Sequence, residues 1–175
     1  PLIPHLGRNL VFFCHPCHFS GFPYGMRKRF FAINMLAHFH GIDRNDWLLE
    51  NRTILPVYEK SNGYFLSVFD VLKSEYPKMR VSAVLDWYPL THYFDSTVPD
   101  TIIDTDGTAE VIDNVLMEIV EKDARFVFTQ IDQMDYAGHG TGYGSEAYLK
   151  DAEKLDKEIS RLINGLGEKG LYEDT

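Results

Sequence analysis

The stretch from Phe126 to Gly144 reads Phe-Val-Phe-Thr-Gln-Ile-Asp-Gln-Met-Asp-Tyr-Ala-Gly-His-Gly-Thr-Gly-Tyr-Gly and decides the fold. It opens with the β-branched and aromatic residues that are typical of a buried parallel strand. From Ser145 onward the apolar residues recur with helical spacing. A strand followed by a helix is the repeating unit of α/β proteins, so the stretch predicts an α/β fold with a mainly parallel sheet.

Three ionisable side chains follow this predicted strand, namely Asp132, Asp135 and His139. Glycines stand at positions 138, 140, 142 and 144, and this density predicts a tight loop that excludes a helix. In open α/β sheets, ligand sites form at the carboxyl ends of the strands. We therefore expect the candidate site in this loop.

Asp135 and His139 are the candidate metal ligands, because carboxylate oxygens and imidazole nitrogens both bind zinc, and also manganese or iron. A turn of four residues, with Gly138 before the histidine, could direct both side chains to one point. The alternative is a polar loop in which Asp135 caps backbone N–H groups and His139 faces water. Spacing alone leaves both interpretations open.

The segment Asp135-Tyr136-Ala137-Gly138-His139, with the glycines and the helical pattern that follow it, resembles the Asp-x-x-Gly-His signature of the type I phosphodiesterase/nucleotide pyrophosphatase family. This family is a branch of the alkaline phosphatase superfamily. The likeness covers about residues 40–175. Further matching segments begin at His40, Asn45, Gly63, Val68, Asp86, Asp104, Tyr148 and Gly170.

The resemblance implies a metal-dependent phosphoester hydrolase with part of an alkaline-phosphatase-like three-layer fold, a parallel sheet flanked by helices. Relatives hold two zinc ions beside the phosphate, and a Thr or Ser attacks the phosphorus atom. By motif, Asp135 and His139 would bind one of these ions. Asp132 is a candidate for a residue that does not bind the ion itself but orients the histidine. The expected partner is a small phosphoester such as a nucleotide, and the resemblance favours an extracytoplasmic or secretory location.

Parts of the family pattern are missing from this sequence. The metal-binding Asp and the nucleophile expected near the amino terminus find no match, since Ser20 and Thr53 lie in the wrong context. The chain stops at Thr175, where relatives continue to an Asp-His pair and a further His. The catalytic nucleophile is therefore unassigned. We expect at most a partial zinc site, with little activity in the chain alone; the alternative is a catalytically silent relative that serves as an interaction module.

Length and charge restrict the possible partners. The chain has 175 residues, 45% of them hydrophobic, and a net charge of −9. This acidity argues against binding of a nucleic-acid duplex, and no apolar run reaches the roughly 20 residues of a membrane-spanning helix. Residues 1–40 form a basic segment rich in His and Phe, whereas all 26 acidic residues follow Gly41. We therefore expect residues 41–175 to form part of the catalytic domain.

The basic segment carries Cys14-His15-Pro16-Cys17-His18, which matches the pattern of c-type haem attachment. The same cluster could bind zinc together with His38 and His40, although these two histidines stand too close in sequence for a zinc finger. Chance occurrence in a His-rich stretch is the favoured interpretation. A strand at Leu10–Phe13 and a helix at Lys28–Phe39 are predicted there.

Between these regions the pattern predicts ordinary α/β elements. Ser67 and Asp70 resemble a capping box at the start of a helix that Pro77 stops. Val81–Trp87 is a predicted strand. Asp86 at its end could be a site residue, but a loop cap or a surface position is the favoured interpretation. Thr108 opens a helix, and the two acids just before it, Asp104 and Asp106, are predicted to stabilise its amino end. The last helix is predicted from Ser145 to about Asn164.

Overall fold

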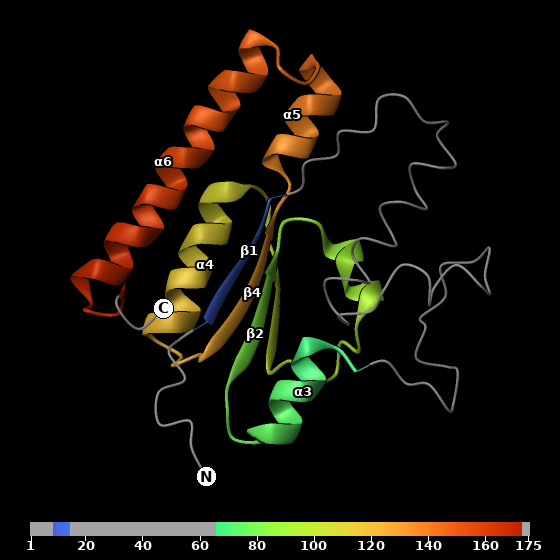
Figure 1. Ribbon diagram of the computed structural model, residues 1–175, viewed down its shortest axis with the longest axis vertical. Helices are drawn as coiled ribbons and strands as arrows, with labels where there is room; N and C mark the ends of the chain where they lie inside the picture. The colour runs from blue at the N-terminus through green and yellow to red at the C-terminus, as the bar shows by residue number, and fades with distance from the viewer. Residues whose placement is uncertain (1–8, 15–65, 173–175) are drawn as a thin grey trace, which may run out of the picture. The chain divides into compact units, whose positions relative to one another are not determined.

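The computed structural model describes residues 9–14 and 66–172, with side chains for residues 66–91 and 94–172 (Figure 1). The chain divides into two compact units. The first unit comprises Pro1–Pro16, Lys78–Tyr88 and Pro99–Thr175, and the second comprises Cys17–Pro77 and Pro89–Val98. The candidate site of the sequence analysis lies wholly in the first unit.

The first unit contains a four-stranded sheet. Its strands are β1 (Asn9–Cys14), β2 (Val81–Leu85), β3 (Thr101–Asp104) and β4 (Phe126–Ile131), in the order β1-β4-β2-β3. Each pair of neighbouring strands is parallel. Every residue of β2 and of β4 is buried, which explains why both strands are mostly apolar and do not alternate between apolar and polar residues.

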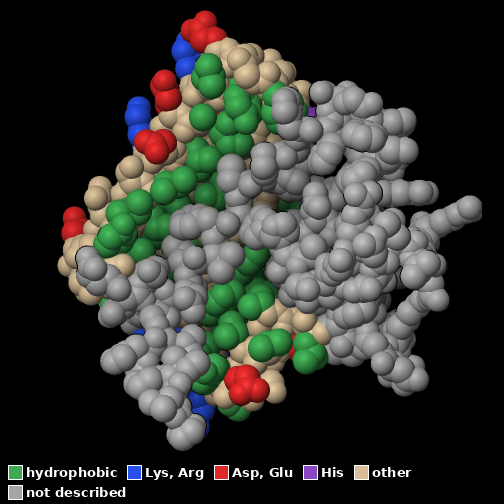
Figure 2. Space-filling view, in the orientation of Figure 1, with side chains coloured by type: hydrophobic (Ala, Val, Ile, Leu, Met, Phe, Trp, Pro, Cys, Tyr) green, Lys and Arg blue, Asp and Glu red, His purple; other side chains and the backbone are tan. Residues whose placement is uncertain are grey.

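Three helices accompany the sheet: α4 (Thr108–Val120), α5 (Gln133–Thr141) and α6 (Glu146–Glu168). Helix α4 packs on β2 and β4, and α6 packs on both α4 and α5 (Figure 1). Apolar side chains from these elements form one core, made of Val84, Val111, Ile112, Val115, Ile119, Ala124, Val127, Ile131, Met134, Leu155, Leu162 and Leu166. Figure 2 shows charged side chains along the outer edge of α6. The helix also carries the ion pairs Lys150–Glu146 and Lys154–Asp151.

In the second unit, the described residues form helix α3 (Val68–Glu75) and most of the 3₁₀ helix η2 (Tyr88–Tyr93). Ser67 and Asp70 form the predicted capping box, in which each side chain accepts a hydrogen bond from the other residue's backbone N–H. The helix ends before Pro77, as predicted. Phe69 and Phe94 pack with ring centroids 4.8 Å apart and are almost completely buried.

The prediction that the glycines exclude a helix is wrong. Residues Gln133–Thr141 form α5, which includes Gly138 and Gly140. Glycine weakens a helix by about 1 kcal/mol relative to alanine, but α5 buries Met134 and Ala137 and packs against α6. Tertiary packing therefore outweighs the low helix propensity. The helix ends at Gly142, where φ is 89°.

Helix α6 begins as predicted, with Ser145 accepting a hydrogen bond from the N–H of Tyr148. It runs beyond the predicted end at Asn164 and includes Gly165 and Gly167. A Cβ atom on Gly165 would lie 2.9 Å from Leu116 of α4, so this glycine permits a close approach of two helices. Strand β3 was not predicted, because its residues lie at the sheet edge and form no buried apolar run.

The structure confirms the α/β class, the parallel sheet and the flanking helices that the resemblance implies for part of an alkaline-phosphatase-like fold. The predicted strand at Leu10–Phe13 is confirmed as β1. Several predictions fall outside the described residues. They concern the helix at Lys28–Phe39, the Cys17–His18 part of the cysteine cluster, Ser20, Thr53 and the domain boundary at residue 40. No helix among residues 66–172 combines the length and the apolar character needed to cross a membrane.

Candidate metal site at the carboxyl end of β4

The carboxylate of Asp86 accepts hydrogen bonds from two loops at the carboxyl end of the sheet. One of its carboxylate oxygens accepts a hydrogen bond from the backbone N–H of Gly107, at 2.7 Å. The other accepts from the N–H of Asp132, at 3.0 Å. Gly107 precedes α4 and Asp132 precedes α5, so a single carboxylate fixes the starts of both helices. This arrangement agrees with the predicted role of Asp86 as a loop cap.

Replacing Asp86 with alanine is expected to lower the free energy of unfolding by about 1 kcal/mol. Hydrogen bonds to a charged group contribute about 1.5–3 kcal/mol each when buried, but Asp86 is half-exposed and water can replace part of the loss. Urea denaturation of the two proteins measures the difference. Asp106→Ala, at an exposed carboxylate of the neighbouring turn, is the control and should change stability by less than about 0.5 kcal/mol.

Gln133 provides a second connection between the helices. Its amide oxygen accepts a hydrogen bond from the hydroxyl of Thr108, the first residue of α4. Its amide N–H group donates to the backbone carbonyl of Asp151 in α6, at 3.0 Å. The start of α5 is therefore attached to both neighbouring helices. This role of Gln133 was not predicted, because a glutamine near two aspartates carries no distinguishing pattern.

An acidic side chain in the first turn of α4 stabilises the turn that precedes the helix. The backbone N–H of Asp106 donates to the carboxylate of Glu110 in the first turn of the helix. Asp104 ends β3 and is exposed. Negative side chains near a helix amino terminus are favourable because of the helix dipole. The contact uses the backbone of Asp106 and not its carboxylate, so the role predicted for the carboxylates of Asp104 and Asp106 stays a prediction.

Asp135 and His139 lie one turn apart on α5 and converge. The Nε2 atom of His139 lies 3.5 Å from Oδ2 of Asp135. The imidazole is 62% exposed and the carboxylate 20% exposed, so the pair faces solvent and neither side chain is buried in the apolar core. The four-residue spacing that the sequence analysis assigned to a loop brings the two groups together because residues i and i+4 share one face of a helix.

Asp132 stands beside this pair in a less polar setting. The pKa of its carboxyl group is raised from 3.8 to about 6, mainly by burial and also by the neighbouring charges of Asp135 and Asp86. A hydrogen bond from Gln130 and the proximity of His139 act in the opposite direction. Gln130 is itself buried, and its Oε1 atom has no hydrogen-bond partner. A negative charge at Asp132 is therefore costly unless a cation lies nearby.

Among the described residues, the candidate metal ligands are two, which is fewer than a complete zinc site contains. In the described part of the chain, no three His, Cys, Asp or Glu side chains come close enough together to hold a metal ion. Catalytic zinc ordinarily has three protein ligands and one open position. Asp135 and His139 thus fit two positions of such a site. Whether they bind a metal remains a prediction.

The family model described as type I phosphodiesterase / nucleotide pyrophosphatase matches residues 35–175. The chain belongs to this family. The match confirms the resemblance drawn from the Asp-x-x-Gly-His segment and extends it five residues upstream of His40. Among curated proteins there is no match to the chain. Membership of this family relates the chain to hydrolases of phosphoesters and pyrophosphates.

Proposed function

We propose that the chain is part of a metal-dependent phosphoester hydrolase in which Asp135 and His139 supply two ligands to one zinc ion. The supporting observation is the 3.5 Å approach of Nε2 of His139 to Oδ2 of Asp135 at the carboxyl end of a central parallel strand. A carboxylate and an imidazole that converge on one point, and that are both open to solvent, suit a divalent cation. The family match agrees with this chemistry.

When bound, such an ion polarises the phosphoryl oxygen and lowers the pKa of a nucleophile. The chain's own residues have defined parts in this proposal. Asp135 and His139 hold the cation and fix its place relative to the sheet. Asp132 adds negative charge behind them, and a bound cation would relieve the cost of that charge. The exposed imidazole leaves room for a small phosphoester such as a nucleotide. The nucleophile is not assigned to any described residue.

A site with two described ligands is expected to bind zinc weakly. Titration calorimetry on the metal-stripped full chain measures the zinc affinity directly. His139→Ala is expected to weaken binding tenfold or more, because it removes one of two donors. The matched control is Tyr136→Ala, which removes a ring of similar size from the same helix at a side chain that is 78% exposed. Equal zinc affinity in His139→Ala and in the unmodified chain would contradict the proposal.

The limited donor set also favours a second candidate, a catalytically silent family member that acts as an interaction module. A nitrophenyl phosphodiester separates the two functions. A hydrolase is expected to release nitrophenol at a rate that rises with added zinc and falls in Asp135→Asn. A silent relative is expected to release none at any zinc concentration. The exposed Glu153→Gln on α6 controls for loss of a negative charge elsewhere in the chain.

A further inference from the structure

Tyr143 contacts both members of the candidate pair. Its hydroxyl donates a hydrogen bond to Oδ1 of Asp135, at 3.0 Å. Its ring meets the imidazole of His139 edge to face, with centroids 5.9 Å apart and planes at 72°. The hydroxyl donates to Oδ1, and the other carboxylate oxygen, Oδ2, faces His139. One residue therefore touches each of the two groups that converge.

The glycines around Tyr143 allow it to reach this position. Gly142 and Gly144 have φ angles of 89° and 78°, which residues with a side chain rarely adopt. They turn the chain back so that the tyrosine ring lies over α5. The ring fills the space beside Gly138, where an added Cβ atom would lie 2.2 Å from the ring. The glycine of the Asp-x-x-Gly-His segment thus makes room for Tyr143.

The ring is also supported from the far side. Tyr148 of α6 packs against it with centroids 5.6 Å apart. The backbone of Tyr148 is held in turn by the Ser145 cap. Tyr143 is therefore packed between α5 and the first turn of α6, and its hydroxyl points at the carboxylate. A side chain held in this way can fix the rotamer of its hydrogen-bond partner.

We propose that Tyr143 is a positioning residue for a divalent cation at Asp135 and His139. By occupying Oδ1, its hydroxyl presents Oδ2 as a single donor on the side where Nε2 of His139 lies. This inference rests on the proposed function, because it concerns the same pair of ligands. It assigns to a residue outside the family signature the task of preorganising that pair. Partners that orient metal ligands typically contribute about tenfold to a hundredfold in affinity.

Tyr143→Phe tests the hydroxyl while keeping the ring that packs on Gly138 and Tyr148. In the full chain, the affinity for zinc is expected to fall about tenfold. With Co²⁺ in place of zinc, the visible absorption bands are expected to change in intensity, because a carboxylate freed at Oδ1 can bind through both oxygens. Tyr136→Phe removes a phenol hydroxyl from the exposed face of α5 and should change neither quantity. Circular dichroism verifies that each variant is folded.

Gly138→Ala tests the same contact from the other side. The new methyl group would meet the Tyr143 ring, which can turn away without breaking the backbone. Zinc affinity is therefore expected to fall as in Tyr143→Phe, and the double variant should show no further loss. Gly140→Ala is the matched control, because it lies on the same helix and its added Cβ atom would meet nothing within 4 Å.

The outcomes separate this inference from the proposed function. If zinc binding is lost in His139→Ala but unchanged in Tyr143→Phe and Gly138→Ala, the positioning role of Tyr143 is wrong and the metal site stands. If the unmodified chain binds neither zinc nor Co²⁺, the proposed function fails, and the inference fails with it. A tenfold loss in Tyr143→Phe, with an altered Co²⁺ spectrum and an unaffected Tyr136→Phe control, supports both.

Discussion

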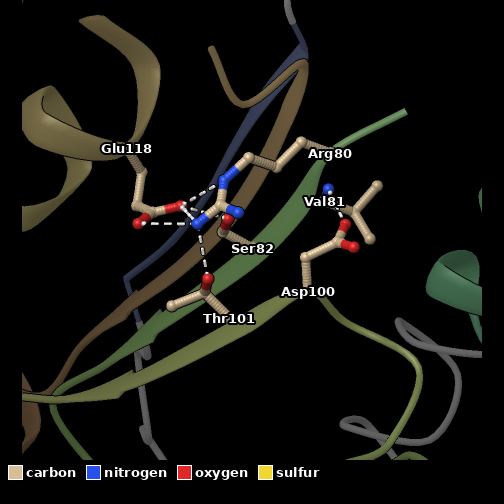
Figure 3. Close-up of polar contacts among 6 residues, drawn as sticks. All are labelled: Arg80, Val81, Ser82, Asp100, Thr101 and Glu118. Carbon is tan, nitrogen blue, oxygen red and sulfur yellow. Dashed lines mark hydrogen bonds and ion pairs between the residues drawn. The ribbon is translucent and has the colours of Figure 1, made fainter. Parts of the chain in front are cut away.

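Replacing Arg80 with alanine is expected to lower the free energy of unfolding by about 3 kcal/mol. The guanidinium group of Arg80 pairs with the carboxylate of Glu118, at 3.1 Å, and also donates to the hydroxyl of Thr101, at 2.6 Å (Figure 3). The Glu118 side chain is only 2% exposed. Ser82 of β2 donates a further hydrogen bond to the same carboxylate, at 2.5 Å. This network joins β2, β3 and α4.

The expected loss is large because the carboxylate of Glu118 would keep its buried position without its countercharge. Breaking a buried ion pair by removing one partner costs about 3–5 kcal/mol. The side chain of Arg80 is 34% exposed, which places the expected value at the lower end of that range. Glu118→Gln should cost less than Arg80→Ala, because the arginine can then turn to water and the amide can still bond to Ser82. Glu118→Gln is therefore expected to have a higher free energy of unfolding than Arg80→Ala.

Urea denaturation measures both variants. Lys154→Ala provides the control, because Lys154 is paired with Asp151 on the surface of α6 and its side chain is 68% exposed. Exposed ion pairs contribute about 0.2–1 kcal/mol, so this variant should unfold at nearly the same urea concentration as the unmodified chain. If Arg80→Ala is as stable as Lys154→Ala, the buried network contributes little and the argument is wrong.

The sequence predicted those parts of the fold that depend on local pattern. The apolar runs of β2 and β4, the capping box at Ser67 and the helix start at Ser145 are signals carried by neighbouring residues. Strand β3 depends instead on its place beside β2 at the sheet edge. Its three residues of intermediate burial and one exposed residue carry no periodicity that a single sequence could reveal.

The glycines show why the site was predicted only in part. Gly138 was predicted to lie in a loop and Gly165 just beyond the end of the last helix, yet both lie within helices. In each case the missing Cβ atom makes room for a side chain from outside the glycine's own helix, Tyr143 at Gly138 and Leu116 at Gly165. Close packing of this kind is a tertiary property. The chemistry of Asp135 and His139 could therefore be predicted, whereas the helix that brings them together could not.

Asp132→Asn is expected to raise the free energy of unfolding of the metal-free chain by about 2 kcal/mol near neutral pH. In the folded chain the carboxyl group of Asp132 has a pKa of about 6, raised from 3.8 by burial and by the neighbouring carboxylates Asp135 and Asp86. The full shift corresponds to about 3 kcal/mol, and partial exposure of the side chain to solvent reduces the expected effect. Asparagine removes the charge and keeps an oxygen that can accept the hydrogen bond from Gln130.

The sign of the pH dependence follows from proton binding. Between about pH 4 and pH 6 the folded chain holds a proton on Asp132 that the unfolded chain has lost, so stability decreases as pH rises through this window. Below about pH 4 both states are protonated at this residue, and the advantage of Asp132→Asn should disappear. Above about pH 6 both states are ionised, and the difference should become constant. Urea denaturation in the presence of EDTA, over this pH range, measures the difference between the two proteins.

Added zinc should abolish the difference in stability between Asp132→Asn and the unmodified chain if the proposed site is correct. A cation held by Asp135 and His139 would stabilise the negative charge of Asp132, lower its pKa and remove the advantage of the asparagine variant. Glu153→Gln, on the exposed face of α6, should show no pH-dependent difference with or without zinc. If Asp132→Asn is no more stable than the unmodified chain near neutral pH without metal, the buried charge is not costly. In that case the electrostatic argument for a cation at the carboxyl end of β4 loses its support, and the convergence of Asp135 and His139 carries the proposal alone.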